Sequence, residues 1–207
     1  MSARTLRQIV GVAPNLQAGA TLAAARTALV LIDYQNEYGS GPLALPDEAA
    51  ASAAARRLRS WADQAGIVVI HVLHQAPAGA PIFAPDSPGA APLAGLAPAL
   101  GETVILKHLP SAFSETKLAE VLQGKGIDTL LIAGYMTHNC VDSTARAAFH
   151  RGYRVGVVAD ASATRDLPGP DGRTIPAATV HAAVLAGLGD RIAKIVDVAT
   201  LVAMPVI

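Results

Sequence analysis

Three ionisable residues, Asp33, Lys107 and Cys140, follow apolar runs of the sequence. Asp33 comes directly after ALVLI and Lys107 directly after TVIL, while five residues separate Cys140 from LLIAG. Together they supply a carboxylate, an ammonium and a thiol, which could act as base, electrostatic partner and nucleophile in hydrolysis of a carbonyl compound. Each also has an ordinary structural use, as a turn cap, a solvated strand tip or small core filling. Residue type alone leaves both interpretations open.

The sequence around Cys140, the chain's one cysteine, favours a reactive thiol. The run that begins there is helix-compatible up to Gly152, so the sulfur would lie at a helix N-terminus. The partial positive charge of that terminus, with Lys107 nearby, would favour the thiolate, and Asp33 could take and return the proton. His138 offers an alternative base, although a spacing of two residues in a loop need not bring its ring to the sulfur. A thiol sensor or non-catalytic binding protein would need Cys140 alone.

Six runs rich in branched aliphatic residues predict the strands that position these groups: residues 28–32, 67–73, 103–106, 129–133, 154–159 and 192–198. They are nearly continuous in apolar character, as strands buried on both faces should be. Helix-compatible segments lie between most of them, at residues 46–66, 114–124, 140–152 and 176–189. This alternation predicts an α/β fold, a three-layer α/β/α sandwich around a six-stranded parallel, Rossmann-like sheet. Ligands of such sheets bind beyond the carboxyl ends of the strands.

Two regions interrupt the alternation. Residues 1–24 have no strong period and are expected to form an N-terminal arm, with residues 25–207 as a single domain. Residues 75–101 are rich in Pro, Ala and Gly, and a loop of this length usually serves as a lid, a binding loop or a subunit contact.

Composition narrows the classes of partner. Lys plus Arg equals Asp plus Glu, at 16 each, so charge does not favour nucleic acid or an anionic membrane surface. Hydrophobic residues make up 52% of the 207, yet no apolar stretch approaches the roughly 20 residues that cross a bilayer. One cysteine and no signal-like apolar start favour a cytoplasmic location.

Three motifs in this order, DYQNEY, KHLPSAF and GYMTHNCVDSTARAA, resemble those of the isochorismatase-like cysteine hydrolases. The resemblance covers about residues 28–198 and implies that Asp33, Lys107 and Cys140 form a catalytic triad. It also implies a cis peptide between Tyr135 and Met136, and an oxyanion hole made by the backbone N–H groups of Met136 and Cys140. Family members commonly form homodimers or homotetramers, which we expect here.

The resemblance implies hydrolysis of a C–N bond in a small amide, carbamoyl or ureide substrate through a thioester. A vinyl-ether hydrolase of the isochorismatase type is the alternative, although such members lack the cysteine. No cofactor is expected, and no metal, because HVLHQAPAG contains His71 and His74 but no Asp-x-His pair. By their positions beside the triad, five residues are candidate substrate contacts: Tyr38, His108, Phe113, Tyr135 and Thr137.

Overall fold

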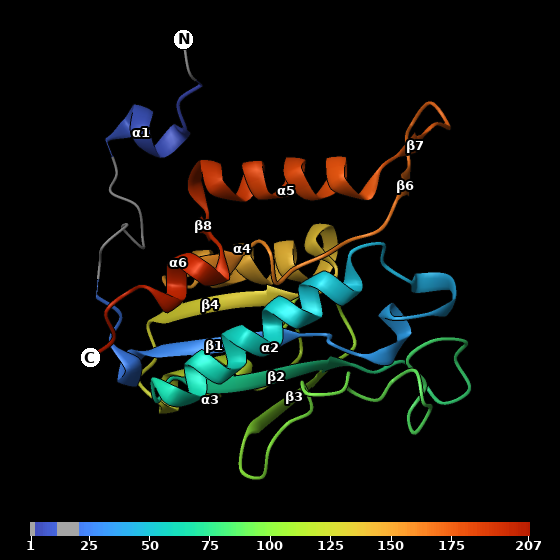
Figure 1. The fold of residues 1–207 in the computed structure, drawn as a ribbon, viewed down its shortest axis with the longest axis horizontal. Helices are drawn as coiled ribbons and strands as arrows, with labels where there is room; N and C mark the ends of the chain where they lie inside the picture. The colour runs from blue at the N-terminus through green and yellow to red at the C-terminus, as the bar shows by residue number, and fades with distance from the viewer. Residues whose placement is uncertain (1–2, 12–20) are drawn as a thin grey trace.

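The computed structural model describes residues 3–11 and 21–207. Six strands form its central sheet: β1 (Thr27–Ile32), β2 (Val68–His74), β3 (Thr103–Lys107), β4 (Thr129–Gly134), β5 (Arg154–Val158) and β8 (Lys194–Val196). All neighbours run parallel, in the order β3-β2-β1-β4-β5-β8. Helices lie over both faces of this sheet (Figure 1), so the three-layer α/β/α fold expected from the sequence is confirmed.

Two groups of helices cover the sheet: α2 (Glu48–Gln64) and α6 (Val198–Val202) on one face, α3 (Leu118–Gly124), α4 (Asp142–His150) and α5 (Ala177–Arg191) on the other. Each face has its own hydrophobic cluster because alternate residues of a strand point to opposite sides. Leu29 and Leu31 of β1 join the cluster of α2 and α6, whereas Val30 and Ile32 join that of α3, α4 and α5.

Alanine lets α2 lie close to the sheet. Its buried apolar residues recur at the three- and four-residue intervals of one helix face, and all but one are alanine: Ala51, Ala54, Ala55, Leu58 and Ala62. Small side chains reduce the distance between a helix and the strands that it covers. The excess of alanine in the composition therefore serves layer packing.

Helix boundaries differ from the prediction where side chains or packing intervene. The hydroxyl of Thr116 donates to the Ala112 carbonyl and accepts from the Leu118 amide, which holds residues 112–117 in turns, so α3 begins at Leu118 rather than at residue 114. At the other end of the chain, α5 continues past Gly189 to Arg191. A Cβ at Gly189 would lie 3.2 Å from Ile195, so this glycine serves close packing against β8 rather than helix termination.

Several short elements were not expected. A small hairpin joins β6 (Leu167–Pro168) to β7 (Thr174–Ile175), and it projects from the body of the molecule near the start of α5 (Figure 1). The last predicted strand, residues 192–198, is only three residues long as β8 and is followed by α6. The remaining turns of helix are η1 (Ala24–Arg26), η2 (Asn36–Tyr38), η3 (Gly41–Leu43) and η4 (Thr137–Val141).

The N-terminal region, expected as an arm, contains α1 (Leu6–Val10). The Leu6 amide donates to Asp190 and the Arg7 guanidinium donates to the Arg191 carbonyl, so α1 is attached to the C-terminal end of α5. Residues 1–2 and 12–20 of the expected arm lie outside the described residues. No helix within the described ranges is long and apolar enough to cross a membrane.

Candidate active site

The carboxyl ends of β1 and β4 meet because Gly134 has no side chain. A Cβ at this position would lie 2.0 Å from the Ile32 carbonyl oxygen, and its φ of +144° is one that other residues rarely adopt. Asp33, the next residue after β1, has a φ of 54°, a left-handed conformation that Asp tolerates better than most residues. This close approach brings the turn after β4 next to the carboxylate of Asp33.

That turn, η4, is a π-helical turn that leads into α4 and contains Cys140. The Thr137 amide donates to the Ala163 carbonyl at 2.9 Å, and the Thr137 hydroxyl is hydrogen-bonded to Nδ1 of His181 at 2.9 Å. The nucleophile candidate is thus held from two sides, by the segment after β5 and by α5. Cys140 lies at the start of a helical run, as the sequence predicts, but in a wider turn than an α-helix.

The three side chains singled out in the sequence lie together. Nζ of Lys107 is 2.7 Å from Oδ2 of Asp33 and 3.2 Å from Sγ of Cys140. It is also 3.3 Å from Nδ1 of His74, so the three N–H donors of the ammonium each have a partner. Asp33 and Lys107 are fully buried and Cys140 is 4% exposed.

The Asp33 carboxylate keeps unused acceptor capacity. Oδ2 pairs with Lys107 at 2.7 Å, whereas in the described part of the chain Oδ1 accepts no hydrogen bond. Burial raises the pKa of Asp33, although the charge of Lys107 and hydrogen bonds to the carboxylate oppose the shift. Asp33 is therefore suited to accept a proton from a neighbouring group.

The thiol of Cys140 is protonated at neutral pH. Burial and then the Asp33 carboxylate raise its pKa to about 12, and the opposing effect of Lys107 is smaller. The expectation that the helix terminus and Lys107 would favour a resting thiolate is therefore wrong for this state. The physical reason is that desolvation of the thiolate is the largest effect, and the Asp33 carboxylate outweighs the opposing charge of Lys107.

His74 is a neighbour of the triad that the sequence placed only at the pocket edge. Burial, followed by the charges of Lys107 and His108, lowers its pKa to about 4, so the ring is neutral and Nδ1 can accept a hydrogen bond from Lys107. The strand pattern could have predicted this contact, because His74 and Lys107 are the last residues of the neighbouring strands β2 and β3 and lie opposite one another. The other histidine, His71, lies inside the sheet as expected and is hydrogen-bonded to Glu102.

Three of the five candidate substrate contacts lie beside the triad. Tyr38 is buried, and its pKa is raised by that burial and then by the charges of Asp33 and Cys140. Tyr135 packs edge-on against Tyr38 with ring centroids 5.3 Å apart, and its hydroxyl is directed to Glu48. The third, Thr137, is held by His181 as described above.

The other two candidates have structural contacts instead. His108 is exposed, and its ring is hydrogen-bonded to the Gln75 carbonyl at 2.6 Å. Phe113 stacks with Tyr153 at 5.9 Å and lies beneath the Arg151 guanidinium, next to the start of β5 rather than its carboxyl end. Position in the sequence suggested both residues, and the contacts of their rings are with Gln75, Tyr153 and Arg151.

The backbone around the sulfur includes the peptide expected to be unusual. The Tyr135–Met136 bond is cis. Within residues 3–11 and 21–207, the Met136 amide makes no hydrogen bond to the protein, whereas that of Thr137 is occupied. His138 is hydrogen-bonded to the Thr164 hydroxyl, which gives its ring a partner other than Cys140.

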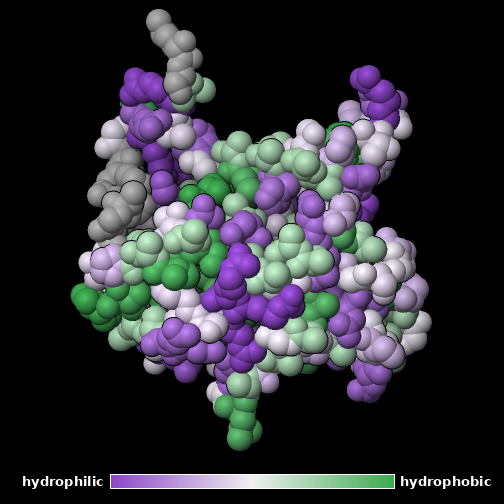
Figure 2. Space-filling view, in the orientation of Figure 1, coloured by the Kyte–Doolittle hydropathy of each residue, from purple (hydrophilic) through white to green (hydrophobic). Residues whose placement is uncertain are grey.

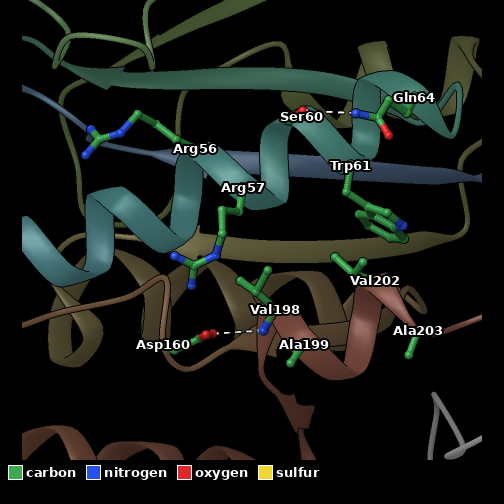
Figure 3. Close-up of a pocket in the computed structure, with 10 residues that line it drawn as sticks. All are labelled: Arg56, Arg57, Ser60, Trp61, Gln64, Asp160, Val198, Ala199, Val202 and Ala203. Atoms are coloured by element: carbon green, nitrogen blue, oxygen red, sulfur yellow. Dashed lines mark hydrogen bonds between the residues drawn. The ribbon is translucent and has the colours of Figure 1, made fainter.

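Two cavities formed by the described residues are not bordered by Asp33, Lys107 or Cys140. A groove of about 710 Å³ runs between α2 and α6, lined by Trp61, Arg57, Val198 and their neighbours (Figure 3), and none of the three side chains borders it. A smaller cavity of about 390 Å³ is bordered by His74, Gln35 and residues 85–91. The ring of His74 separates this second cavity from Lys107.

The segment 75–101 covers part of the site. Phe83 is buried, and its ring centroid lies 5.4 Å from that of Tyr38 and 5.1 Å from that of His74. The Phe83 amide donates to Glu37, and the Gln35 amide group donates to the carbonyls of His74 and Ala90. These contacts attach the long loop to the ends of β1 and β2.

Residues 27–200 match the family model described as the Isochorismatase domain. The chain belongs to the isochorismatase family. A secreted isochorismatase effector of Verticillium dahliae is 36% identical over 167 residues, which are 81% of this chain and 85% of that protein. A maleamate amidohydrolase of Pseudomonas putida is 34% identical over 149 residues, 64% of this chain and 70% of that one.

Solved structures of isochorismatase-family proteins share the fold. An isochorismatase from Pseudomonas putida superposes with a TM-score of 0.89 at 38% sequence identity, covering 96% of this chain and 99% of that one. Membership of the isochorismatase family identifies the chain as a hydrolase. Amide hydrolysis is among the activities for which its relatives are named.

Proposed function

We propose that this chain is a cysteine-dependent hydrolase that cleaves the C–N bond of a small amide, carbamoyl or ureide compound through a thioester. The observation that carries the proposal is the placement of one buried ammonium, that of Lys107, in contact with both Asp33 and Cys140. A nucleophile, a proton acceptor and a fixed cation then lie within reach of one bound carbonyl.

The proposed reaction begins with the protonated thiol. Asp33 takes the proton of Cys140 as the sulfur attacks the carbonyl carbon, and the resulting oxyanion accepts hydrogen bonds from the backbone N–H groups of Met136 and Cys140. Asp33 then gives the proton to the leaving nitrogen, the C–N bond breaks, and ammonia or an amine departs from the thioester.

Hydrolysis of the thioester regenerates the site. Asp33 takes a proton from water as the water oxygen attacks the thioester carbon, the C–S bond breaks, and the proton passes to the sulfur as the acid is released. Lys107 keeps its charge throughout and stabilises the anionic forms of Asp33 and Cys140 in turn. No step uses a metal or an organic cofactor.

The amide reaction is favoured over two rivals. Vinyl-ether hydrolysis, suggested by the names of several relatives, does not require a thiol nucleophile, so it would leave the contact between Lys107 and Cys140 without a role. A thiol sensor would need an accessible sulfur of low pKa, whereas Cys140 is buried and its pKa is raised.

An ammonia-release screen over small amides, carbamoyl compounds and ureides tests the proposal. We expect release by the native chain, loss of release in Cys140→Ala, and retention in Arg146→Ala, a change on the exposed side of α4 where Arg146 pairs with Asp142. Mass spectrometry of an acid-quenched reaction should show an acyl group on Cys140. Release that persists in Cys140→Ala would contradict covalent catalysis.

A further inference from the structure

The outer strand β3 carries a patch of exposed apolar side chains. β3 forms one edge of the sheet, beyond the cover of α2 (Figure 1). Four large apolar residues within ten positions are strongly exposed: Leu100 at 106%, Val104 at 42%, Leu106 at 50% and Leu109 at 41%. The loop that leads into β3 also forms the hydrophobic projection at the lowest point of Figure 2.

The backbone of β3 is also free along this edge. The Gln75 amide donates to the Lys107 carbonyl, so the peptide groups of Lys107 face β2, and alternation along a parallel strand turns those of Val104 and Leu106 outward. Within the described residues these outward groups have no backbone partner beyond the sheet. The same two residues therefore present both exposed apolar side chains and unpaired N–H and C=O groups.

The edge lacks the features that usually prevent strand pairing. Natural edge strands are protected by proline, an outward charge, a bulge or a covering element. Residues 103–106 read TVIL and contain neither proline nor charge, and the register with β2 is unbroken. The charge of Lys107 is directed into the interior, where its side chain is fully buried. An edge of this kind is suited to receive another strand.

We propose that β3 is the surface through which two copies of this chain associate, with the two β3 strands antiparallel about a two-fold axis at Ile105. This arrangement places Val104 of one copy opposite Leu106 of the other, where outward peptide groups can exchange hydrogen bonds as an antiparallel pair. It also brings Leu100, which precedes one strand, to Leu109, which follows the other.

Self-complementarity selects a second copy as the partner. The four exposed residues pair with one another under a single two-fold rotation, with no residue of another protein required. A five-residue ladder alone is smaller than the roughly 800 Å² per partner of a standard interface, so Leu100, Leu109 and their loops must belong to the contact. Pairing would also brace the strand that ends in Lys107.

Analytical ultracentrifugation tests the surface. We expect the native chain to sediment as a dimer, and Val104→Lys or Leu106→Lys to weaken dimerisation by at least about 100-fold, because each dimer would bury two unpaired ammonium groups. Val202→Lys is the matched control, since Val202 is 49% exposed on α6, and it should remain dimeric. Circular dichroism should show that the variants keep the native fold.

Cross-linking tests the register. In a Cys140→Ala background, Val104→Cys combined with Leu106→Cys should give a covalent dimer under mild oxidation, because residue 104 of each copy faces residue 106 of the other. Val202→Cys in the same background should stay monomeric on a denaturing gel. A native chain that is monomeric at every concentration, or a dimer that Leu106→Lys leaves intact, would overturn the proposal.

Discussion

The ammonium of Lys107 is committed to the protein. Its three donors point to Asp33, Cys140 and His74, which leaves none for a substrate. In the proposed reaction Lys107 would therefore act through its charge, and the carbonyl oxygen of the substrate would take its hydrogen bonds from backbone amides. His74 accepts from Lys107 because its own pKa is held low, so it keeps the ammonium in place without adding a competing charge.

The pKa of Cys140 provides a test of this arrangement. Asp33→Asn removes the negative charge that is the second cause of the raised value, so the pKa of Cys140 should fall below about 12 while burial still holds part of the shift. Asn also tolerates the left-handed backbone at this position. The pH dependence of thiolate ultraviolet absorbance, corrected with Cys140→Ala, measures the change. An unaltered titration would show that Asp33 and Cys140 are not electrostatically coupled.

At the residue scale, the sequence predicts the triad because each member ends or follows a buried strand. Parallel strands end at one edge, so proximity of the three follows from topology alone. The partners of the triad are harder to predict. Contact between His74 and Lys107 depends on register, and that between Thr137 and His181 depends on how α5 crosses the sheet. The pKa of Cys140 could not be predicted, because it depends on the degree of burial.

At the scale of elements, Gly134 determines how closely β4 approaches β1. Gly134→Ala would place a methyl group 2.0 Å from the Ile32 oxygen and force a φ unfavourable to alanine, so we expect a loss of at least about 3 kcal/mol in the free energy of unfolding. Urea denaturation of the native chain and of the variant measures this loss.

Gly124→Ala is the matched control for this measurement. Gly124 lies at the end of α3, and the methyl group of an alanine there would have no other atom within 4 Å. The change should therefore leave the free energy of unfolding unaltered or raise it by no more than about 1 kcal/mol. Equal effects of the two substitutions would show that the close approach of β1 and β4 is not what requires Gly134.

Long elements were predictable and short ones were not. The six strands of the sheet lie within a few residues of their predicted positions because each has a continuous apolar run. The two-residue strands β6 and β7 are too short for any periodicity and exist only as a pair. Likewise, the π-helical turn around Cys140 arises from hydrogen bonds of Met136 and Thr137 that no local pattern reveals.

At the scale of the whole molecule, access to the sulfur requires movement. Asp33, Lys107 and Cys140 are nearly inaccessible, and Phe83 closes the side formed by Tyr38 and His74. The loop that carries Phe83 has no helix or strand of its own, and its hydrogen bonds run mainly to residues 34–37 and to α2, so opening around Phe83 would break only part of this set. These contacts favour a lid as the role of residues 75–101.

Phe83→Ala tests the lid. Removing the ring should lower the cost of opening and raise the rate of Cys140 alkylation by a neutral reagent at least about tenfold, the effect of some 1.4 kcal/mol. Phe149→Ala on α4 removes a ring of the same size from a half-buried position and separates local opening from general destabilisation. Equal acceleration in both variants would mean that Phe83 does not gate the site.

The residues just before the family-matched segment 27–200 are hydrogen-bonded to the residues that follow it. Leu22 exchanges backbone hydrogen bonds with Pro205 and Ile207, the Ala24 amide donates to the Ile207 carbonyl, and Arg7 occupies the last carbonyl of α5. Residues 27–200 alone would lose this closure and would end inside α6, without the fully buried Leu201. A gene shortened to the family boundaries would thus encode a less stable protein, so recombinant work should retain the residues before 27 and after 200.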